Sequence, residues 1–428
     1  MPDTAAGHVA PTVAFKTLGC KVNRVESEQT AARLLASGWR VADPDAADVI
    51  VVNTCTVTGE ADAKARKEIR RALAAAGSPY VVVTGCLAAV APDEVARLGE
   101  RVVVVEDRDH VAGAVAALLG ERVAPGGERP SSTHADFRTR AMVKIQDGCD
   151  AWCAYCIVPT ARGSATSRAA DAIVAEVDSL ASAGVGEVVL TGINLGKYRD
   201  RGTDLASLVT ELAGRGPRIR LSSIEPGDLT PALLDVLARS VARREACPHL
   251  HVPLQSGSDR VLAAMGRDYD TGTFARHVGE AAAAIPALAL TTDVIAGLPS
   301  ETEAEAGETL TFAREMGFQR LHVFRYSARA GTRAAAMPDQ VDPRVRTRRA
   351  ADLRRLSDTL FEEYRASRVG AGASVLVEKA SRGTSEDHLA VRVVGAVPRV
   401  SSVVEVRLVG VEADAMIGEA ATGEARTP

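Results

Sequence analysis

The segment Cys149-Asp150-Ala151-Trp152-Cys153-Ala154-Tyr155-Cys156 follows the apolar run Ala141 to Ile145 and carries three cysteines at C-x3-C-x2-C spacing. Three thiolates on one short loop can bind a single iron–sulfur cube, but they leave one of its irons without a protein ligand. A cluster that only carries electrons normally has four cysteine ligands, whereas a metal site that binds a substrate or cofactor keeps a position open. The loop therefore predicts a catalytic cluster.

Zinc and a disulfide are the alternatives to this cluster. Structural zinc usually draws on two separated Cys or His pairs, and the loop contains no histidine that could complete a tetrahedron. Seven cysteines in 428 residues, without an apolar N-terminal signal segment, suit a reducing compartment better than an oxidising one. We therefore favour the cluster and expect a cytoplasmic protein.

Length and composition predict two to three domains, each with its own core. Charged residues make up 25% of the chain and the net charge is −4. This balance neither indicates nor excludes a nucleic-acid partner, because the clustering of arginines matters more than the net charge. The chain has no run of eighteen apolar residues, so we expect no membrane span and no membrane partner.

The first part of the chain alternates apolar strands with amphipathic helices, which predicts a parallel sheet covered by helices on both faces. The expected strands and helices are Thr12 to Leu18, Glu26 to Ala36, Val49 to Val52, Ala61 to Ala75, Tyr80 to Val83 and Val102 to Val105. Cys20, Cys55 and Cys86 each follow a strand, at the edge where such sheets bind ligands. Each alone could be an ordinary core residue. Three in the same structural position predict a shared metal site.

From Ala141 onward, longer strand and helix units predict an open, partial (β/α)6 barrel. The expected strands are Met142 to Ile145, Glu187 to Leu190, Arg218 to Leu221, His249 to Val252, Leu288 to Ile295 and Leu321 to Phe324. The three-cysteine loop follows the first strand, so the cluster is expected at the mouth of the barrel. Polar residues at or just after strand ends can bind a cofactor there or serve as turn and cap residues. These are Thr191, Gly192, Glu225, Gln255 and Asp293.

The remaining segments predict a linker, an arginine-rich helix and a small β domain. Residues 124–134 have a Pro- and Gly-rich linker composition, and beyond residue 370 the apolar residues alternate with period two. We expect an α/β domain at 1–126, the barrel at 135–370 and a small β-barrel at 371–428 with a loose acidic end from Glu412. The helix Asp342 to Arg368 is either an ordinary solvated helix or a phosphate-contacting surface.

The central loop resembles the signature of the radical S-adenosylmethionine superfamily, in which an aromatic residue, here Tyr155, precedes the last cysteine. The order of domains resembles the methylthiotransferases over nearly the whole chain. The stretches that carry this resemblance are residues 18–23 (LGCKVN), 53–58 (NTCTVT), 85–86 (GC), 190–192 (LTG), 251–257 (HVPLQSG), 293–297 (DVIAG) and 326–327 (YS).

The resemblance implies an enzyme with two [4Fe-4S] clusters and S-adenosylmethionine as cofactor. Cys149, Cys153 and Cys156 would hold the cluster that generates the radical. A second cluster, held by Cys20, Cys55 and Cys86, would deliver or hold the sulfur. One cofactor molecule would donate a methyl group and another would yield the radical. Tyr155, Arg168 and the polar residues at the strand ends would contact the cofactor. Arg162 and Arg168 follow the loop and can pair with the cofactor carboxylate or an RNA phosphate, or be surface charges.

Within the family, residues 18–23 resemble the branch that adds a methylthio group to C2 of N6-threonylcarbamoyladenosine at position 37 of tRNA. Sister branches modify N6-isopentenyladenosine in tRNA or an aspartate of a ribosomal protein. The C-terminal unit would be a TRAM-like domain that grips tRNA, and a reducing electron donor such as flavodoxin or ferredoxin would be a second partner. A radical enzyme that attaches no sulfur and a non-catalytic RNA-binding iron–sulfur protein are the alternatives from other classes.

Overall fold

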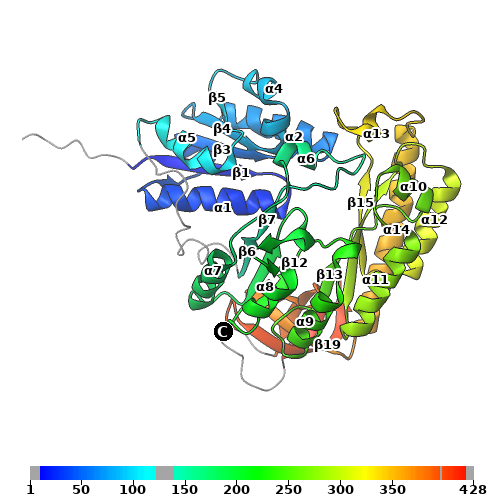
Figure 1. Cartoon of the computed structure of the whole chain (residues 1–428). Coiled ribbons are helices and arrows are strands. Elements are labelled where there is room, and N and C mark those ends of the chain that lie inside the picture. Colours follow the sequence, from blue (N-terminus) through cyan, green and yellow to red (C-terminus); the bar gives the residue numbers. More distant parts are fainter. Residues whose placement is uncertain (1–9, 122–138, 396–397, 421–428) are drawn as a thin grey trace, which may run out of the picture. The chain divides into compact units, whose positions relative to one another are not determined.

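The computed structural model describes residues 10–121, 139–395 and 398–420 (Figure 1). It divides into two compact units, Met1–Thr133 with Ile157–Gly163, and His134–Cys156 with Ser164–Pro428. The linker expected at 124–134 lies outside the described residues. Within those residues, no helix is both long and apolar enough to cross a membrane.

The first unit contains a five-stranded parallel sheet in the order β2-β1-β3-β4-β5. The strands are β1 (Thr12–Thr17), β2 (Arg40–Val41), β3 (Val49–Thr54), β4 (Tyr80–Gly85) and β5 (Val102–Val104). One face packs on α1 (Lys21–Ala36) and α5 (Val111–Ala117), and the other on α2 (Gly59–Leu73), α3 (Cys86–Val90) and α4 (Pro92–Ala96). The predicted parallel sheet with helices on both faces is confirmed.

The alternation of side chains along the strands explains why both faces are covered. Val49 and Val51 of β3 face α1 and α5, whereas Ile50 and Val52 face α2. All six residues of β3 are buried, as expected for a central strand of a parallel sheet. This packing fixes the carboxyl ends of β1, β3 and β4 along one edge of the sheet.

The second unit contains six parallel strands that form an open barrel. They are β6 (Arg140–Lys144), β9 (Glu187–Thr191), β12 (Arg218–Leu221), β13 (His249–His251), β14 (Ala289–Ala296) and β15 (Arg320–Arg325). Two three-stranded sheets, β6-β9-β12 and β13-β14-β15, are joined by single bridges between Ile219 and Ala246 and between Ser223 and His251. The helices pack outside, namely α7 (Ala170–Ser182), α8 (Leu205–Leu212), α9 (Pro231–Ala242), α11 (Thr271–Ala284), α12 (Glu303–Glu315) and α14 (Pro343–Arg368).

A closed five-stranded barrel follows α14, as predicted. Its strands are β16 (Gly372–Lys379), β17 (Arg382–Ser385), β18 (Ala390–Val394), β19 (Val403–Glu412) and β20 (Ala415–Ala420), and its order is β16-β17-β18-β20-β19. The expectation of a loose end from Glu412 is wrong for residues 415–420. β20 pairs with both β18 and β19 and buries Ala415 and Met416, so it closes the barrel. The short apolar run Ala415-Met416-Ile417, although it lies in an acidic segment, is enough to form a strand.

A buried ionic group joins the amino-terminal end of the large barrel to the small one. Glu187 accepts hydrogen bonds of 2.7 Å from both Arg218 and Arg220. The two guanidinium groups also donate to main-chain carbonyls of the small barrel, those of Ser374, Thr384, Ser385 and Glu386. Burial opposes a charged carboxylate, but the two arginines hold the pKa of Glu187 well below its ordinary value.

Replacing Glu187 with Gln is expected to lower the free energy of unfolding by about 3–5 kcal/mol, because two guanidinium groups would stay buried without a counter-charge. The pKa of Glu187 is lower in the folded chain, so its contribution is complete above pH 4.5 and is lost as pH falls below that value. The variant should therefore lose less stability on acidification. Denaturant unfolding followed by circular dichroism measures both effects. The matched control is Glu211→Gln, at an exposed position of α8. If both variants lost the same free energy of unfolding, Glu187 would not be the counter-charge that stabilises the two buried arginines.

Candidate functional site

Three thiols of the first unit lie together at the carboxyl ends of neighbouring strands. Cys20 follows β1 and directly precedes α1, Cys55 follows β3, and Cys86 begins α3 directly after β4. Burial raises the pKa of Cys55, and the nearby charges of Cys86 and Cys20 raise it further. The electrostatic influence of Cys86 and Cys20 on Cys55 indicates that the three thiols are neighbours, and thiolates are the usual ligands of iron–sulfur clusters. The fold thus brings together the three cysteines that the sequence singled out.

Two glycines allow the cysteine-bearing loops to approach one another. Gly19 has φ of +95°, and a Cβ built on it would lie 2.6 Å from Cβ of Cys55. Gly85 has φ of +89°, and its Cβ would lie 2.4 Å from both the Asn53 side-chain oxygen and the Thr54 carbonyl. A side chain at either position would push the loops apart.

We expect Gly85→Ala to destabilise the first unit and to reduce the iron that Cys20, Cys55 and Cys86 retain after reconstitution. The added methyl group would collide with main chain, which cannot move aside as a flexible side chain can. Gly77→Ala is the matched control, since Gly77 has φ of +80° but nothing within 4 Å of the added Cβ. Iron analysis and thermal unfolding of both variants measure the difference. If the two variants lost iron equally, backbone strain and not the close approach would be the cause.

Side chains missed from the sequence fix the geometry of these loops. Asn23 donates to the carbonyls of Leu18 at 2.9 Å and Thr54 at 2.8 Å, and Asn53 donates to the Asn23 carbonyl at 2.8 Å. Asn23 lies one helical turn after Cys20, and this spacing was the available signal. The amides therefore tie the loop after β1 to the loop after β3.

Arg162 belongs to this group of residues in the first unit. Its side chain is only 1% exposed and donates to Glu26 at 2.9 Å and to Asn23 at 2.5 Å. Burial raises the pKa of Cys86, and Arg162 and Arg108 oppose that rise. The sequence suggested a cofactor carboxylate, an RNA phosphate or solvent as its partner. The structure instead places Arg162 where its charge favours thiolates.

The loop with Cys149, Cys153 and Cys156 is held in the second unit by main-chain bonds. The Ala154 N–H donates to the Met265 carbonyl at 2.8 Å, and the Ala154 carbonyl accepts from Ala334 at 2.8 Å. Ala154 is buried among apolar residues, and Tyr155 packs against the same cluster. Trp152, which precedes Cys153, has φ of +48° and is 60% exposed. The loop is thus anchored at its centre, while the cysteines remain partly accessible.

Two side-chain donors approach the sulfur atoms of this loop. Arg267 lies 3.2 Å from Sγ of Cys153, and Asn194 lies 4.0 Å from Sγ of Cys149. The other guanidinium nitrogens of Arg267 bond to Glu225 and to the Tyr269 hydroxyl. Donors to the sulfur atoms stabilise the negative charge of a cluster and so tune its potential. No local pattern pointed to Arg267, because folding alone brings it to the loop.

The residues expected to contact the cofactor lie around the same mouth. Thr191 ends β9 and is buried, and Gly192 packs against Gln146, whose amide oxygen accepts from the main chain of Ile193 and Asn194. Gln255 has φ of +67° and bonds through its own main chain to both Asp293 and Ile295. Such a conformation is costly for a residue other than glycine, and it is typical of functional sites.

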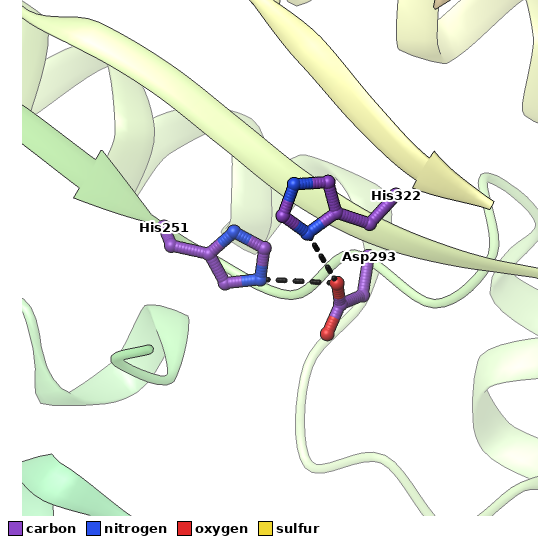
Figure 2. A group of neighbouring side chains, drawn as sticks. All are labelled: His251, Asp293 and His322. Atoms are coloured by element: carbon purple, nitrogen blue, oxygen red, sulfur yellow. Dashed lines mark ion pairs between the residues drawn. The ribbon is translucent and has the colours of Figure 1, made fainter. Parts of the chain in front are cut away.

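Arg168 and Asp293 are engaged by neighbouring residues. Arg168 donates to the Lys144 carbonyl at 2.7 Å and to Glu176 at 2.9 Å, so it anchors β6 next to α7. Asp293 lies between two histidines (Figure 2). No described contact brings either side chain to the three cysteines.

The arginines of α14 differ in exposure. Arg346 and Arg368 are half-buried, and they contact the Tyr326 carbonyl and Asp387. Arg349 and Arg365 are buried and paired with Glu301 and Glu362. Those with exposed side chains are Arg344, Arg348, Arg354 and Arg355, of which Arg348 and Arg355 form ion pairs. Much of the charge is thus neutralised within the chain.

The residues present fit iron–sulfur clusters. In the described part of the chain, six of the seven free cysteines fall into two groups of three. Cationic or amide donors approach each group, and the glycines leave room beside the first. Thiolates are the usual ligands of such clusters, and three of them leave one iron of a cube open.

Comparison with known proteins agrees with this geometry. Residues 12–106 match the profile of an uncharacterized protein family, UPF0004, and residues 143–313 match that of the radical SAM superfamily. The threonylcarbamoyladenosine tRNA methylthiotransferase MtaB of Bacillus subtilis is 40% identical and covers 88% of this chain and 87% of its own. The protein of the same name from Chlamydia pneumoniae is 34% identical, and the match covers 96% of this chain and 98% of the relative. A tRNA-2-methylthio-N(6)-dimethylallyladenosine synthase of Syntrophobacter fumaroxidans is 36% identical, and the match covers 86% of this chain and 85% of the relative.

Among solved structures, the radical S-adenosylmethionine methyltransferase TsrM from Kitasatospora setae aligns with a TM-score of 0.57. The two sequences are 14% identical, and the alignment covers 76% of this chain and 77% of that one. At this level of identity, the likeness concerns the fold alone.

Proposed function

The chain belongs to the family of radical S-adenosylmethionine tRNA methylthiotransferases, and from this premise we propose that it adds a methylthio group to C2 of N6-threonylcarbamoyladenosine at position 37 of tRNA. Enzymes of this family use two [4Fe-4S] clusters and S-adenosylmethionine. The observation that carries the proposal is the pair of three-cysteine groups, one at the carboxyl ends of three parallel strands and the other on a single loop that follows β6 and the short β7 (Gln146–Asp147).

The two groups have different tasks. Cys149, Cys153 and Cys156 hold the cluster at the barrel mouth, and Cys20, Cys55 and Cys86 hold the second one. When bound, the clusters and S-adenosylmethionine supply the radical, the sulfur and the methyl group. The chain itself supplies ligands, orientation and charge. We assign cofactor contacts to Tyr155, Thr191, Gly192, Glu225 and Gln255. Arg168 supports this site indirectly by holding the end of β6.

The partners follow from this function. The substrate is tRNA, and the small C-terminal barrel is the part that we assign to gripping it. A reducing protein such as flavodoxin or ferredoxin supplies electrons, and the enzyme works in the cytoplasm. These assignments rest on the chemistry that the family requires.

The direct test is an anaerobic assay with reconstituted enzyme, S-adenosylmethionine, a reductant and tRNA that carries N6-threonylcarbamoyladenosine. Mass spectrometry of the nucleosides should show the mass gain of one sulfur and one CH2 on that base. A parallel reaction with tRNA carrying N6-isopentenyladenosine tests the sister activity. Product only in that second reaction would reassign the substrate. If no 5′-deoxyadenosine formed in any reaction, the radical chemistry itself would be refuted.

A further inference from the structure

Three polar side chains converge inside the large barrel, on three adjacent strands. His251 ends β13, while Asp293 of β14 and His322 of β15 are register partners (Figure 2). The neighbouring residues Val294, Leu321 and Val323 pack into the core beneath the helices. Because side chains alternate along a strand, Asp293 and His322 face the barrel interior. Asp293 and His322 lie near the middle of β14 and β15, and His251 lies at the carboxyl end of β13.

Both imidazole rings point a nitrogen at one oxygen of Asp293. Nε2 of His251 lies 3.1 Å from Oδ1, and Nδ1 of His322 lies 3.4 Å from the same atom. The rings are stacked, with centroids 5.0 Å apart and planes inclined by 26°. One anionic oxygen paired with both imidazole rings accounts for this arrangement. The carboxylate therefore fixes the orientation of both rings.

A hydrogen bond at Nδ1 of His251 is consistent with a proton on its other ring nitrogen. Its Nδ1 lies 2.9 Å from the Thr291 hydroxyl, which in turn lies 3.3 Å from Nε2 of His249. The hydroxyl can accept from His249 and donate to His251, which leaves the proton of His251 on Nε2, facing Asp293. His251 is thus buried, and both of its ring nitrogens have a partner within the protein.

His322 is the member of the group that can reach a ligand. Its side chain is 51% exposed, and Nε2 lies on the side of the ring that points away from Asp293. No hydrogen bond among the described residues engages that nitrogen. Three arginines of the barrel are already paired, since Arg218 and Arg220 bind Glu187 and Arg267 binds Glu225. A carboxylate behind the ring strengthens Nε2 as a hydrogen-bonding group.

We propose that His322, oriented by Asp293, recognises the polar threonyl end of the N6 substituent of the base. This inference rests on the proposed function, because only that substrate carries a carboxylate and a hydroxyl at this point, whereas an isopentenyl group is apolar. The His322 imidazole, held from behind by Asp293, is suited to form a hydrogen bond with either the carboxylate or the hydroxyl. Asp293 is then a positioning residue for His322, a task different from the cofactor contact expected from the sequence.

A divalent metal ion is the competing occupant of the three side chains. Two histidines and one carboxylate can bind such an ion, and their ligand atoms lie within 4.8 Å of one another. An ion shared by all three would lie between the ligands. Here both nitrogens contact the same carboxylate oxygen directly, at 3.1 and 3.4 Å, so Asp293 is already paired without an ion. We favour this ion-paired group, and a zinc titration tests the alternative.

The test compares wild-type holoenzyme with His322→Gln in binding two tRNAs that differ only in base 37, either N6-threonylcarbamoyladenosine or unmodified adenosine. The variant should bind the modified tRNA about tenfold to a hundredfold more weakly and the unmodified tRNA unchanged. A general structural defect would weaken both. His277→Gln, on the outer helix α11, is the matched control and should leave both dissociation constants unchanged. Iron content and circular dichroism verify that each variant is folded.

A third tRNA, with a glycylcarbamoyl group in place of the threonylcarbamoyl group, keeps the carboxylate and lacks the hydroxyl. Wild-type binding that survives this change identifies the carboxylate as the group that His322 contacts, and binding that weakens as in the variant identifies the hydroxyl. The inference is overturned if His322→Gln binds the modified tRNA normally, if it alters only the KM for S-adenosylmethionine, or if zinc binds stoichiometrically to the wild type and not to the variant. Failure of the wild type to methylthiolate threonylcarbamoyl tRNA would instead refute the proposed function.

Discussion

Cys153→Ala is expected to lower the iron content of the reconstituted protein from about eight to about four per chain and to abolish both 5′-deoxyadenosine formation and methylthiolation. Cys153 is one of the three thiols of the barrel loop, and Arg267 donates to its sulfur. Two remaining thiolates cannot hold a cube with a single open iron. The radical step and every later step should therefore fail together.

Iron analysis, electron paramagnetic resonance of the reduced protein and chromatography of the cofactor products measure these losses. Cys247→Ala is the matched control, because Cys247 is buried beside Glu187 and belongs to neither group of three. It should retain about eight irons and both activities. If Cys153→Ala still formed 5′-deoxyadenosine, the loop would not be the radical site.

Cys55→Ala is expected to remove a similar amount of iron with a different functional result. The barrel loop is intact in this variant, so 5′-deoxyadenosine should still form on reduction, while no sulfur reaches the base. Cys55 is buried between the loops that carry Cys20 and Cys86, and its loss leaves too few ligands for the second cluster.

The same assays applied to Cys55→Ala separate the two clusters. Unchanged iron in this variant would mean that the first unit holds no cluster. Full methylthiolation with only half of the iron would mean that this cluster is not needed for sulfur attachment.

Much of the architecture followed from local patterns in the sequence. Short valine-rich runs between amphipathic helices predicted the first sheet, and the period-two alternation after Gly372 predicted the small barrel. β20 was missed because Ala415-Met416-Ile417 is brief and lies among acidic residues. Its stability comes from pairing with two strands that are distant in the sequence, which no local pattern reveals.

The neighbourhood of Cys20, Cys55 and Cys86 was predictable because each follows a strand end, and parallel strands bring their ends to one edge. Cys149, Cys153 and Cys156 were predictable as a group because they share one loop. The residues that surround the cysteines were not predictable in this way. Arg267 reaches Cys153 from a segment more than a hundred residues later. Arg162 follows the barrel loop in sequence, yet its side chain serves Asn23 and Glu26 of the first unit. The role of His322 depends on its register with Asp293, which only the folded sheet defines.

The measurement that tests the central claim most directly is nucleoside analysis of tRNA from cells that have or lack this protein. We predict that 2-methylthio-N6-threonylcarbamoyladenosine is present only with the protein, that the unthiolated base accumulates without it, and that the wild-type gene restores the product whereas Cys55→Ala and Cys153→Ala do not. A tRNA profile that is the same with and without the protein, or a loss confined to methylthio-isopentenyladenosine, would contradict the account.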